Sequence, residues 1–82
     1  MDPSYLKDLL WRGREVEFDY GTSSYSVKLV DLHSTTEFIF CKKWSNSTLT
    51  SDYFEGILYN RGFGVTLDDI LKEVSGSSIR VY

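Results

Sequence analysis

The stretch from residue 14 to residue 20 constrains the fold most, because charged and apolar residues alternate through it as Arg-Glu-Val-Glu-Phe-Asp-Tyr. Successive side chains of a β-strand point to opposite faces, so this pattern predicts a strand with one apolar face and one acidic face. The apolar positions, which we expect in the core, are Val16, Phe18 and Tyr20. The acidic positions, which we expect in solvent, are Glu15, Glu17 and Asp19. The polar stretch at 21–24 then predicts a turn into a partner strand, and therefore a β-hairpin.

The remaining elements follow from capping residues, apolar periodicity and chain breakers. Asp2 and Pro3 are typical of a helix start, and Thr66 with Asp69 has the spacing of a capping box, as does Asp52 with Glu55. The predicted elements are a helix at 3–12, strands at 14–20, 25–32 and 37–44, a loop at 45–50, a short helix that begins at Asp52, a helix that begins at Thr66 and is ended by Gly76, and a strand at 78–82. This order, α-β-β-β-α-α-β, predicts a small α+β domain over 1–82, with an antiparallel sheet and helices packed on one face.

Composition limits the classes of function. The chain has 82 residues and a net charge of −3, which disfavours non-specific attraction to nucleic acid or to an anionic membrane. No apolar run is long enough to span a membrane, no signal-peptide pattern is visible, and Cys41 is the only cysteine. We therefore expect a cytoplasmic protein that does not act at a membrane. Aromatic residues make up 16% of the chain, and we expect some of them on the surface as contact residues.

No set of residues in the sequence forms a legible catalytic apparatus. His33 is the only histidine and lies in a predicted polar turn, where a surface role is the ordinary interpretation. Cys41 lies within an aromatic strand, as a small buried hydrophobic residue would. Because a nucleophile, a base and an orienting group are not found together, we expect no enzyme, no catalytic residues, no metal and no cofactor.

Binding to another macromolecule is the function that the residue pattern favours. A row of carboxylates on one strand face is typical of a solvated strand, but it also suits a basic partner surface. Exposed Trp and Tyr residues are frequent anchors of protein interfaces. The candidate partner-binding residues are Glu15, Glu17, Asp19, Trp44 and Tyr53, and we leave open that Trp44 and Tyr53 belong to the core.

Two alternatives involve smaller or different ligands. The glycine-containing loop before the helix that begins at Thr66 predicts an anion site for a nucleotide, which a homodimer would sequester between its subunits. Its candidate residues are Arg61, Gly62, Gly64 and Thr66. A plain turn between helices is the ordinary interpretation of that loop. Lys42, Lys43 and Trp44 also form a basic–aromatic segment suited to weak binding of single-stranded nucleic acid, which the net negative charge disfavours.

Two segments resemble a known group of proteins. Residues 9–20, Leu-Leu-Trp-Arg-Gly-Arg-Glu-Val-Glu-Phe-Asp-Tyr, resemble the opening of short uncharacterised proteins of Gram-positive bacteria and their phages. In those proteins a GREIEFEY strand leads a hairpin that closes on a YSI-like strand, for which this chain has Tyr-Ser-Val at 25–27. Residues 66–74, Thr-Leu-Asp-Asp-Ile-Leu-Lys-Glu-Val, are similar to their TLKDIW-EV terminal helix. The resemblance implies a phage or prophage setting and supplies no catalytic residues.

These observations together predict a non-enzymatic interaction protein of a phage or mobile element. Its expected role is to bind a host protein, to block or redirect it, as anti-CRISPR proteins and other inhibitors of bacterial immune systems do. We expect the three carboxylates to compete for a basic surface that normally meets nucleic acid, so that the host protein would be a nucleic-acid-binding one.

Overall fold

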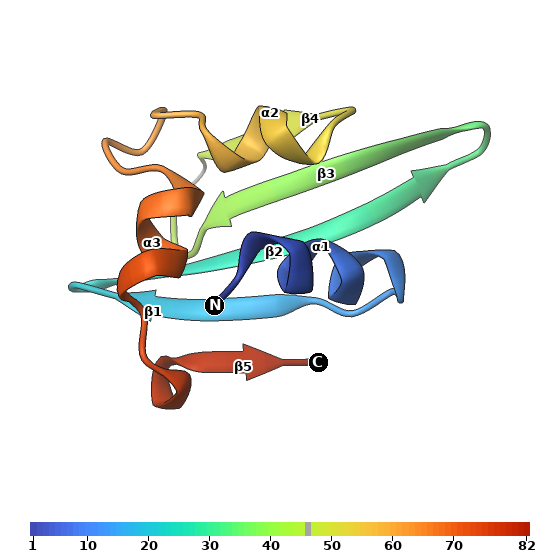
Figure 1. The fold of residues 1–82 in the computed structure, drawn as a ribbon. Helices are drawn as coiled ribbons and strands as arrows, with labels where there is room; N and C mark the ends of the chain where they lie inside the picture. The colour runs from blue at the N-terminus through green and yellow to red at the C-terminus, as the bar shows by residue number, and fades with distance from the viewer. Residues whose placement is uncertain (46) are drawn as a thin grey trace.

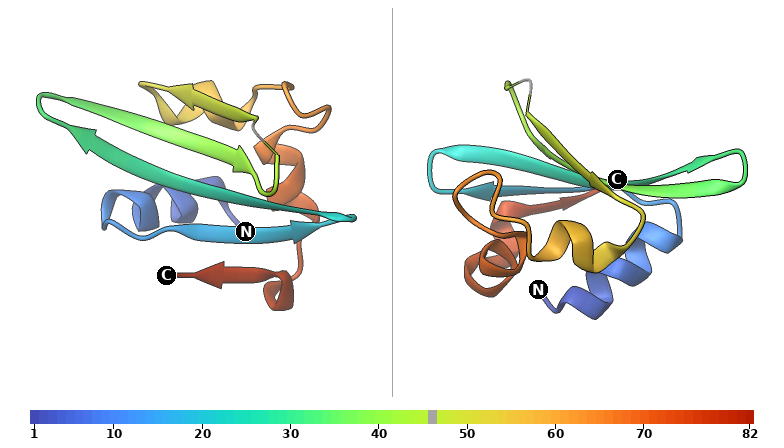
Figure 2. Two further views of the ribbon diagram at one scale, coloured as in Figure 1. Left: turned by 180° about the vertical axis from the view of Figure 1, so that it is seen from behind. Right: turned by 90° about the horizontal axis from the view of Figure 1, so that it is seen from above.

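A five-stranded antiparallel sheet, in the order β4-β3-β2-β1-β5, carries all three α-helices on one of its faces (Figures 1 and 2). This computed structural model describes residues 1–45 and 47–82. Its elements are α1 (Pro3–Trp11), β1 (Val16–Tyr20), β2 (Ser23–Leu32), β3 (Thr35–Lys42), β4 (Thr48–Ser51), α2 (Phe54–Leu58), α3 (Leu67–Glu73), the short 3₁₀-helix η1 (Gly76–Ser78) and β5 (Ile79–Val81). The predicted α+β class, with helices on one face of an antiparallel sheet, is confirmed.

The β1–β2 hairpin forms as its alternating pattern predicts. Tyr20 pairs with Ser23, so the turn has two residues instead of the predicted 21–24, and it begins with Gly21 at a φ of +62°. Glycine adopts this left-handed conformation without the steric cost that a Cβ brings, and such turns match the twist of the strands. Val16 and Phe18 are completely buried beneath the helices, so the apolar face is the core face.

The first helix, α1, begins and ends at the predicted signals. Asp2 accepts a hydrogen bond from the Ser4 N–H at 2.8 Å, and Pro3 occupies the first turn. Gly13 follows the helix with a φ of +82°. The buried face consists of Leu6, Leu9 and Leu10. Tyr5, which the periodicity places beside that face, is instead exposed.

The segment predicted as a loop at 45–50 contains a strand, which corrects the prediction. Residues 48–51 form β4 and pair with β3, where Thr48 lies opposite Cys41; residue 46 lies outside the described part of the chain. Four residues of this composition carry no strong periodicity, so pairing with β3 decides their conformation. The adjoining helix α2 packs close to β4, since a Cβ on Gly56 would clash with the Ser51 side chain.

Capping at the two C-terminal helices differs. At α3 the Thr66 hydroxyl accepts from the Asp69 N–H at 3.0 Å, and the Asp69 carboxylate accepts from the Thr66 N–H at 3.3 Å, so the predicted capping box is confirmed. The helix ends at Glu73, before Gly76, which begins η1 instead. At α2 the predicted pair of Asp52 and Glu55 is wrong, because Tyr53 precedes the helix without a side-chain cap.

The core lies between the sheet and the helical layer. Two of its ring pairs meet edge-on, with centroid distances of 5.8 Å for Phe38 and Phe54 and 5.1 Å for Phe40 and Phe63. The β2–β3 turn is shorter than predicted, because β3 already starts at Thr35. The strand also ends earlier than predicted, at Lys42, so Trp44 lies beyond it. The longest helix among the described residues, α1, has nine residues, too few to span a membrane.

Candidate interaction surface

The sheet face opposite the helices, here called the open face, carries the main polar cluster of the molecule. Side chains alternate along each strand, so the neighbours of the buried core residues point to this face. Strand pairing sets Cys41 of β3, Ser26 of β2, Glu17 of β1 and Arg80 of β5 in one row across it. In the described part of the chain the helices lie on the other side of the sheet (Figure 2).

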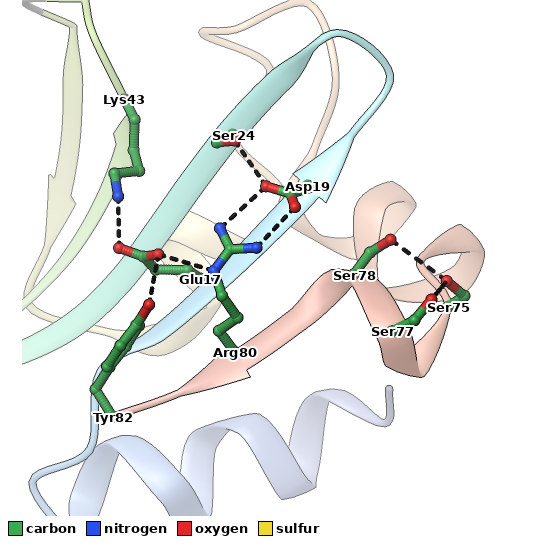
Figure 3. Close-up of polar contacts among 9 residues, drawn as sticks. All are labelled: Glu17, Asp19, Ser24, Lys43, Ser75, Ser77, Ser78, Arg80 and Tyr82. Atoms are coloured by element: carbon green, nitrogen blue, oxygen red, sulfur yellow. Dashed lines mark hydrogen bonds and ion pairs between the residues drawn. The ribbon is translucent and has the colours of Figure 1, made fainter.

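Glu17 is the centre of the cluster. The Lys43 Nζ lies 2.6 Å from one carboxylate oxygen of Glu17, while the Arg80 Nε and the Tyr82 hydroxyl each lie 3.2 Å from the other (Figure 3). Only 9% of Glu17 is exposed. Lys43 follows β3 and Arg80 belongs to β5, so this carboxylate connects parts of the sheet on both sides of β1.

Asp19 extends the cluster along β1. The Arg80 guanidinium donates two hydrogen bonds to its carboxylate, with nitrogen–oxygen distances of 2.7 and 3.0 Å, and the Ser24 hydroxyl donates a third at 2.7 Å. Such two-point pairs restrict the arginine geometry more than a single contact does. We call the set Glu17, Asp19, Lys43, Arg80 and Tyr82 the charged network.

The charged network shifts the acid–base equilibria of its members. Hydrogen bonding from Lys43 is the main reason that the pKa of Glu17 is lowered, and burial opposes this effect. Hydrogen bonds from Arg80 and then from Ser24 lower the pKa of Asp19 to about 2. The Glu17 carboxylate in turn raises the pKa of Lys43. Both acids are therefore ionised at neutral pH and matched by the two cations.

This geometry corrects the prediction of a free acidic row. Glu17 and Asp19 lie on the predicted side of β1, away from the core, whereas Glu15 precedes the strand. The carboxylates of Glu17 and Asp19 are nevertheless satisfied within the molecule by Lys43 and Arg80, so they are not free in solvent. Glu15 is half-buried, and its side chain makes no described ion pair. Competition for a basic surface by three free carboxylates therefore loses its structural basis.

Trp44 stands beside the charged network and is 87% exposed. The Lys43 Nζ lies 5.4 Å from the centroid of its indole ring, within the range of a cation–π contact. The Trp44 backbone has a φ of +60°, a conformation that is sterically unfavourable for a bulky residue. Tyr82, another exposed aromatic residue, reaches Glu17 through its hydroxyl. The Lys43–Glu17 ion pair therefore lies between two exposed rings, with Trp44 next to Lys43 and Tyr82 next to Glu17.

Tyr53 is exposed as well, but it belongs to another part of the molecule. It is the residue before α2, in the helical layer, and 73% of its surface is accessible. Tyr53 and Trp44 are both predicted from the sequence as contact residues. The structure supports exposure of both residues, and places Trp44 beside the charged network and Tyr53 at the start of a helix.

The glycine loop of the alternative ligand site has its polar groups engaged internally. The Gly62 N–H donates to the Asn60 side chain at 2.8 Å, and the Gly64 N–H donates to the Arg61 carbonyl at 2.9 Å. Thr66 is occupied by the capping box, in which its hydrogen bonds lower the pKa of Asp69. An anion at this helix start would therefore meet a carboxylate. Arg61 is exposed, and nucleotide capture there stays a prediction without a structural argument in its favour.

Arg80 is the functional candidate that sequence reasoning missed. It stands between Ile79 and Val81, whose alternation already placed it on the face away from the core. The pairing of β5 with β1, which sets Arg80 opposite Glu17, could not be read from the sequence.

Within residues 1–45 and 47–82 no group of three or more His, Cys, Asp or Glu residues is arranged to hold a metal ion.

Comparison of the chain with protein-family models, with curated proteins and with solved structures finds no match.

Proposed function

We propose that this protein is a non-enzymatic protein-binding module that contacts its partner through the open face, with Trp44 as the anchor. The observation that carries the proposal is that a tryptophan is 87% exposed on a backbone with positive φ. A non-glycine residue in this conformation costs about 1–2 kcal/mol, and such strain is concentrated at functional sites. Tryptophan is also among the residues that contribute most to binding energy in protein interfaces.

The charged network supports the same role. Glu17 and Asp19 are already paired with Lys43 and Arg80, so a partner that covers this face does not have to neutralise isolated charges. The side chains are also held by several hydrogen bonds, which reduces the entropy lost when the face is covered. We therefore propose that the partner receives the Trp44 ring in an apolar pocket and meets the network with polar groups around it.

The biological setting that we propose is the cytoplasm of a bacterial host. The resemblance of residues 9–20 and 66–74 to short proteins of Gram-positive bacteria and their phages supports it. In this setting the partner is a host protein, and the binding module inhibits it by occupying its surface, as anti-CRISPR proteins do. The internal pairing of Glu17 and Asp19 removes the argument that this partner surface must be basic.

The experiment compares two glycine substitutions at equivalent backbone positions. His33 has a φ of +57° in the β2–β3 turn, so His33→Gly matches Trp44→Gly in its effect on the backbone. A tagged wild-type protein captures a partner from a host lysate, and the affinity of the purified partner is then measured for each variant. We expect Trp44→Gly to weaken binding at least about tenfold and His33→Gly to bind as wild type.

Photocrosslinking then locates the contact face. A benzoylphenylalanine at position 44 is expected to form an adduct with the purified partner, whereas the same group at Tyr59, an exposed residue after α2, is expected to form none. Wild-type affinity in a folded Trp44→Gly variant, or adducts from position 59 alone, would contradict the proposed contact face.

A further inference from the structure

A small hollow lies on the helical side of the sheet, and none of its lining residues belongs to the charged network of the open face. It has a volume of about 180 Å³ and lies where the C-terminal end of α1 meets the β2–β3 hairpin. Its lining residues are Leu10, Trp11, Gly13, Leu29, Asp31 and Thr36. Sites for drug-sized ligands are usually of about 300 Å³ or more, so this hollow has the size of a single side chain.

The position of Asp31 is chemically unusual. On β2 the core-facing residues Tyr25, Val27 and Leu29 lead directly to Asp31, so the alternation sets a carboxylate at the end of an apolar row. Asp31 pairs in register with Thr36 on β3. Among the described contacts its carboxylate has neither an ion pair nor a hydrogen bond, and it is exposed. Its negative charge is therefore free for an external cation.

Trp11 forms an aromatic wall of the hollow. Its ring contacts Phe38 edge-on, with a centroid distance of 6.0 Å, while 55% of the residue is exposed. The contact with Phe38 fixes the ring on one side, and the exposed surface is open to a ligand. An indole beside a free carboxylate is the combination that recognises a guanidinium group, which stacks on the ring and donates two hydrogen bonds to the acid.

The two arginines nearest to Trp11 in sequence are engaged elsewhere, and Lys28, the cation nearest to Asp31, lies on the opposite face of β2 by strand alternation. Arg12 pairs with Asp8 at 3.0 Å, and the Arg14 Nε donates to the carbonyl of Tyr82 at 2.6 Å. A second hollow, between α1 and α2, differs in this respect, because its two charged residues, Lys7 and Glu55, lie 3.8 Å apart and balance each other. The charge of the hollow at Asp31 is therefore unbalanced, whereas that of the other hollow is not.

We infer that the hollow formed by Trp11, Leu29 and Asp31 binds an arginine side chain of a partner protein. The aliphatic part of the arginine packs on Leu10 and Leu29, and its guanidinium stacks on Trp11 and pairs with Asp31. This inference does not rest on the open face, since it involves other residues on the other side of the sheet. It adds a determinant of specificity, because a partner without an arginine at the matching position loses this contact.

The test uses a blocked tripeptide, Ala-Arg-Ala, titrated into the isotopically labelled protein and followed by NMR. We expect the indole N–H signal of Trp11 to shift in a saturable manner at millimolar peptide. The same peptide with citrulline, which has the shape of arginine but no charge, is expected to bind at least about tenfold more weakly. A lysine tripeptide, which lacks the planar guanidinium, is also expected to bind more weakly than Ala-Arg-Ala, and equal binding would contradict the inference.

Two variants identify the residues responsible. Asp31→Asn is exposed and nearly isosteric, so it should retain the fold and lose the charge-dependent part of binding. Trp44→Gly, on the open face, should leave the titration unchanged. If the Trp11 signal does not respond, if citrulline binds as well as arginine, or if Asp31→Asn binds like wild type, the inference is wrong even when the open-face proposal holds.

Discussion

The ammonium group of Lys43 lies 2.6 Å from a carboxylate oxygen of Glu17 and so joins the end of β3 to the middle of β1, across the strand between them. The same carboxylate accepts hydrogen bonds from Arg80 and Tyr82 near the opposite edge of the sheet. A single acid therefore organises the open face from both sides. Its loss should affect stability as well as the presentation of Trp44.

Substitution of Glu17 by Gln should destabilise the fold by about 1–2 kcal/mol, because the cations lose a charged acceptor and the group is largely buried. Lys43→Met removes one donor and should destabilise less, since Arg80 and Tyr82 still donate to the Glu17 carboxylate. Urea unfolding of both single variants and the double variant measures the interaction. We expect the double variant to be more stable than the sum of the single effects predicts. Additive effects would show that the pair is not coupled.

Acid should destabilise the protein in part through Asp19. Its pKa is lowered from 3.8 to about 2, so it binds a proton less readily in the folded state than in the unfolded state. Its contribution to stability is therefore complete above about pH 4 and is lost as the pH falls towards 2. In melting experiments between pH 6 and about pH 2, Asp19→Asn should show a smaller loss of melting temperature than wild type. Ser24→Ala, which removes one donor to Asp19, should show an intermediate loss.

At Trp44 the usual order of glycine and alanine should be reversed. Alanine keeps the Cβ that makes positive φ unfavourable, so Trp44→Gly should be more stable than Trp44→Ala by about 1 kcal/mol. At an exposed helical position such as Lys72, alanine should instead be more stable than glycine by about 1 kcal/mol. Chemical denaturation of these four variants gives both differences. A more stable alanine variant at position 44 would mean that the Trp44 backbone is not strained.

Local patterns in the sequence determined much of this fold. The alternation at 14–20 and the turn glycine at 21 specify the β1–β2 hairpin because strand geometry and positive φ act within a few residues. Asp2 with Pro3, and Thr66 with Asp69, specify where α1 and α3 begin because a cap satisfies the first N–H groups of its own helix. Each of these effects depends only on residues that are close together in the sequence.

Only the tertiary structure decided what each residue meets across the sheet. Residues 48–51 become a strand because β3 presents free hydrogen-bonding groups beside them. The four residues have too little apolar–polar alternation to predict a strand from the sequence. Glu17 and Asp19 become internal ion-pair partners because β5 sets Arg80 beside β1, more than 60 positions later in the chain. Which face a carboxylate occupies is a local property of strand alternation, whereas its neutralisation depends on a cation that strand order and register deliver.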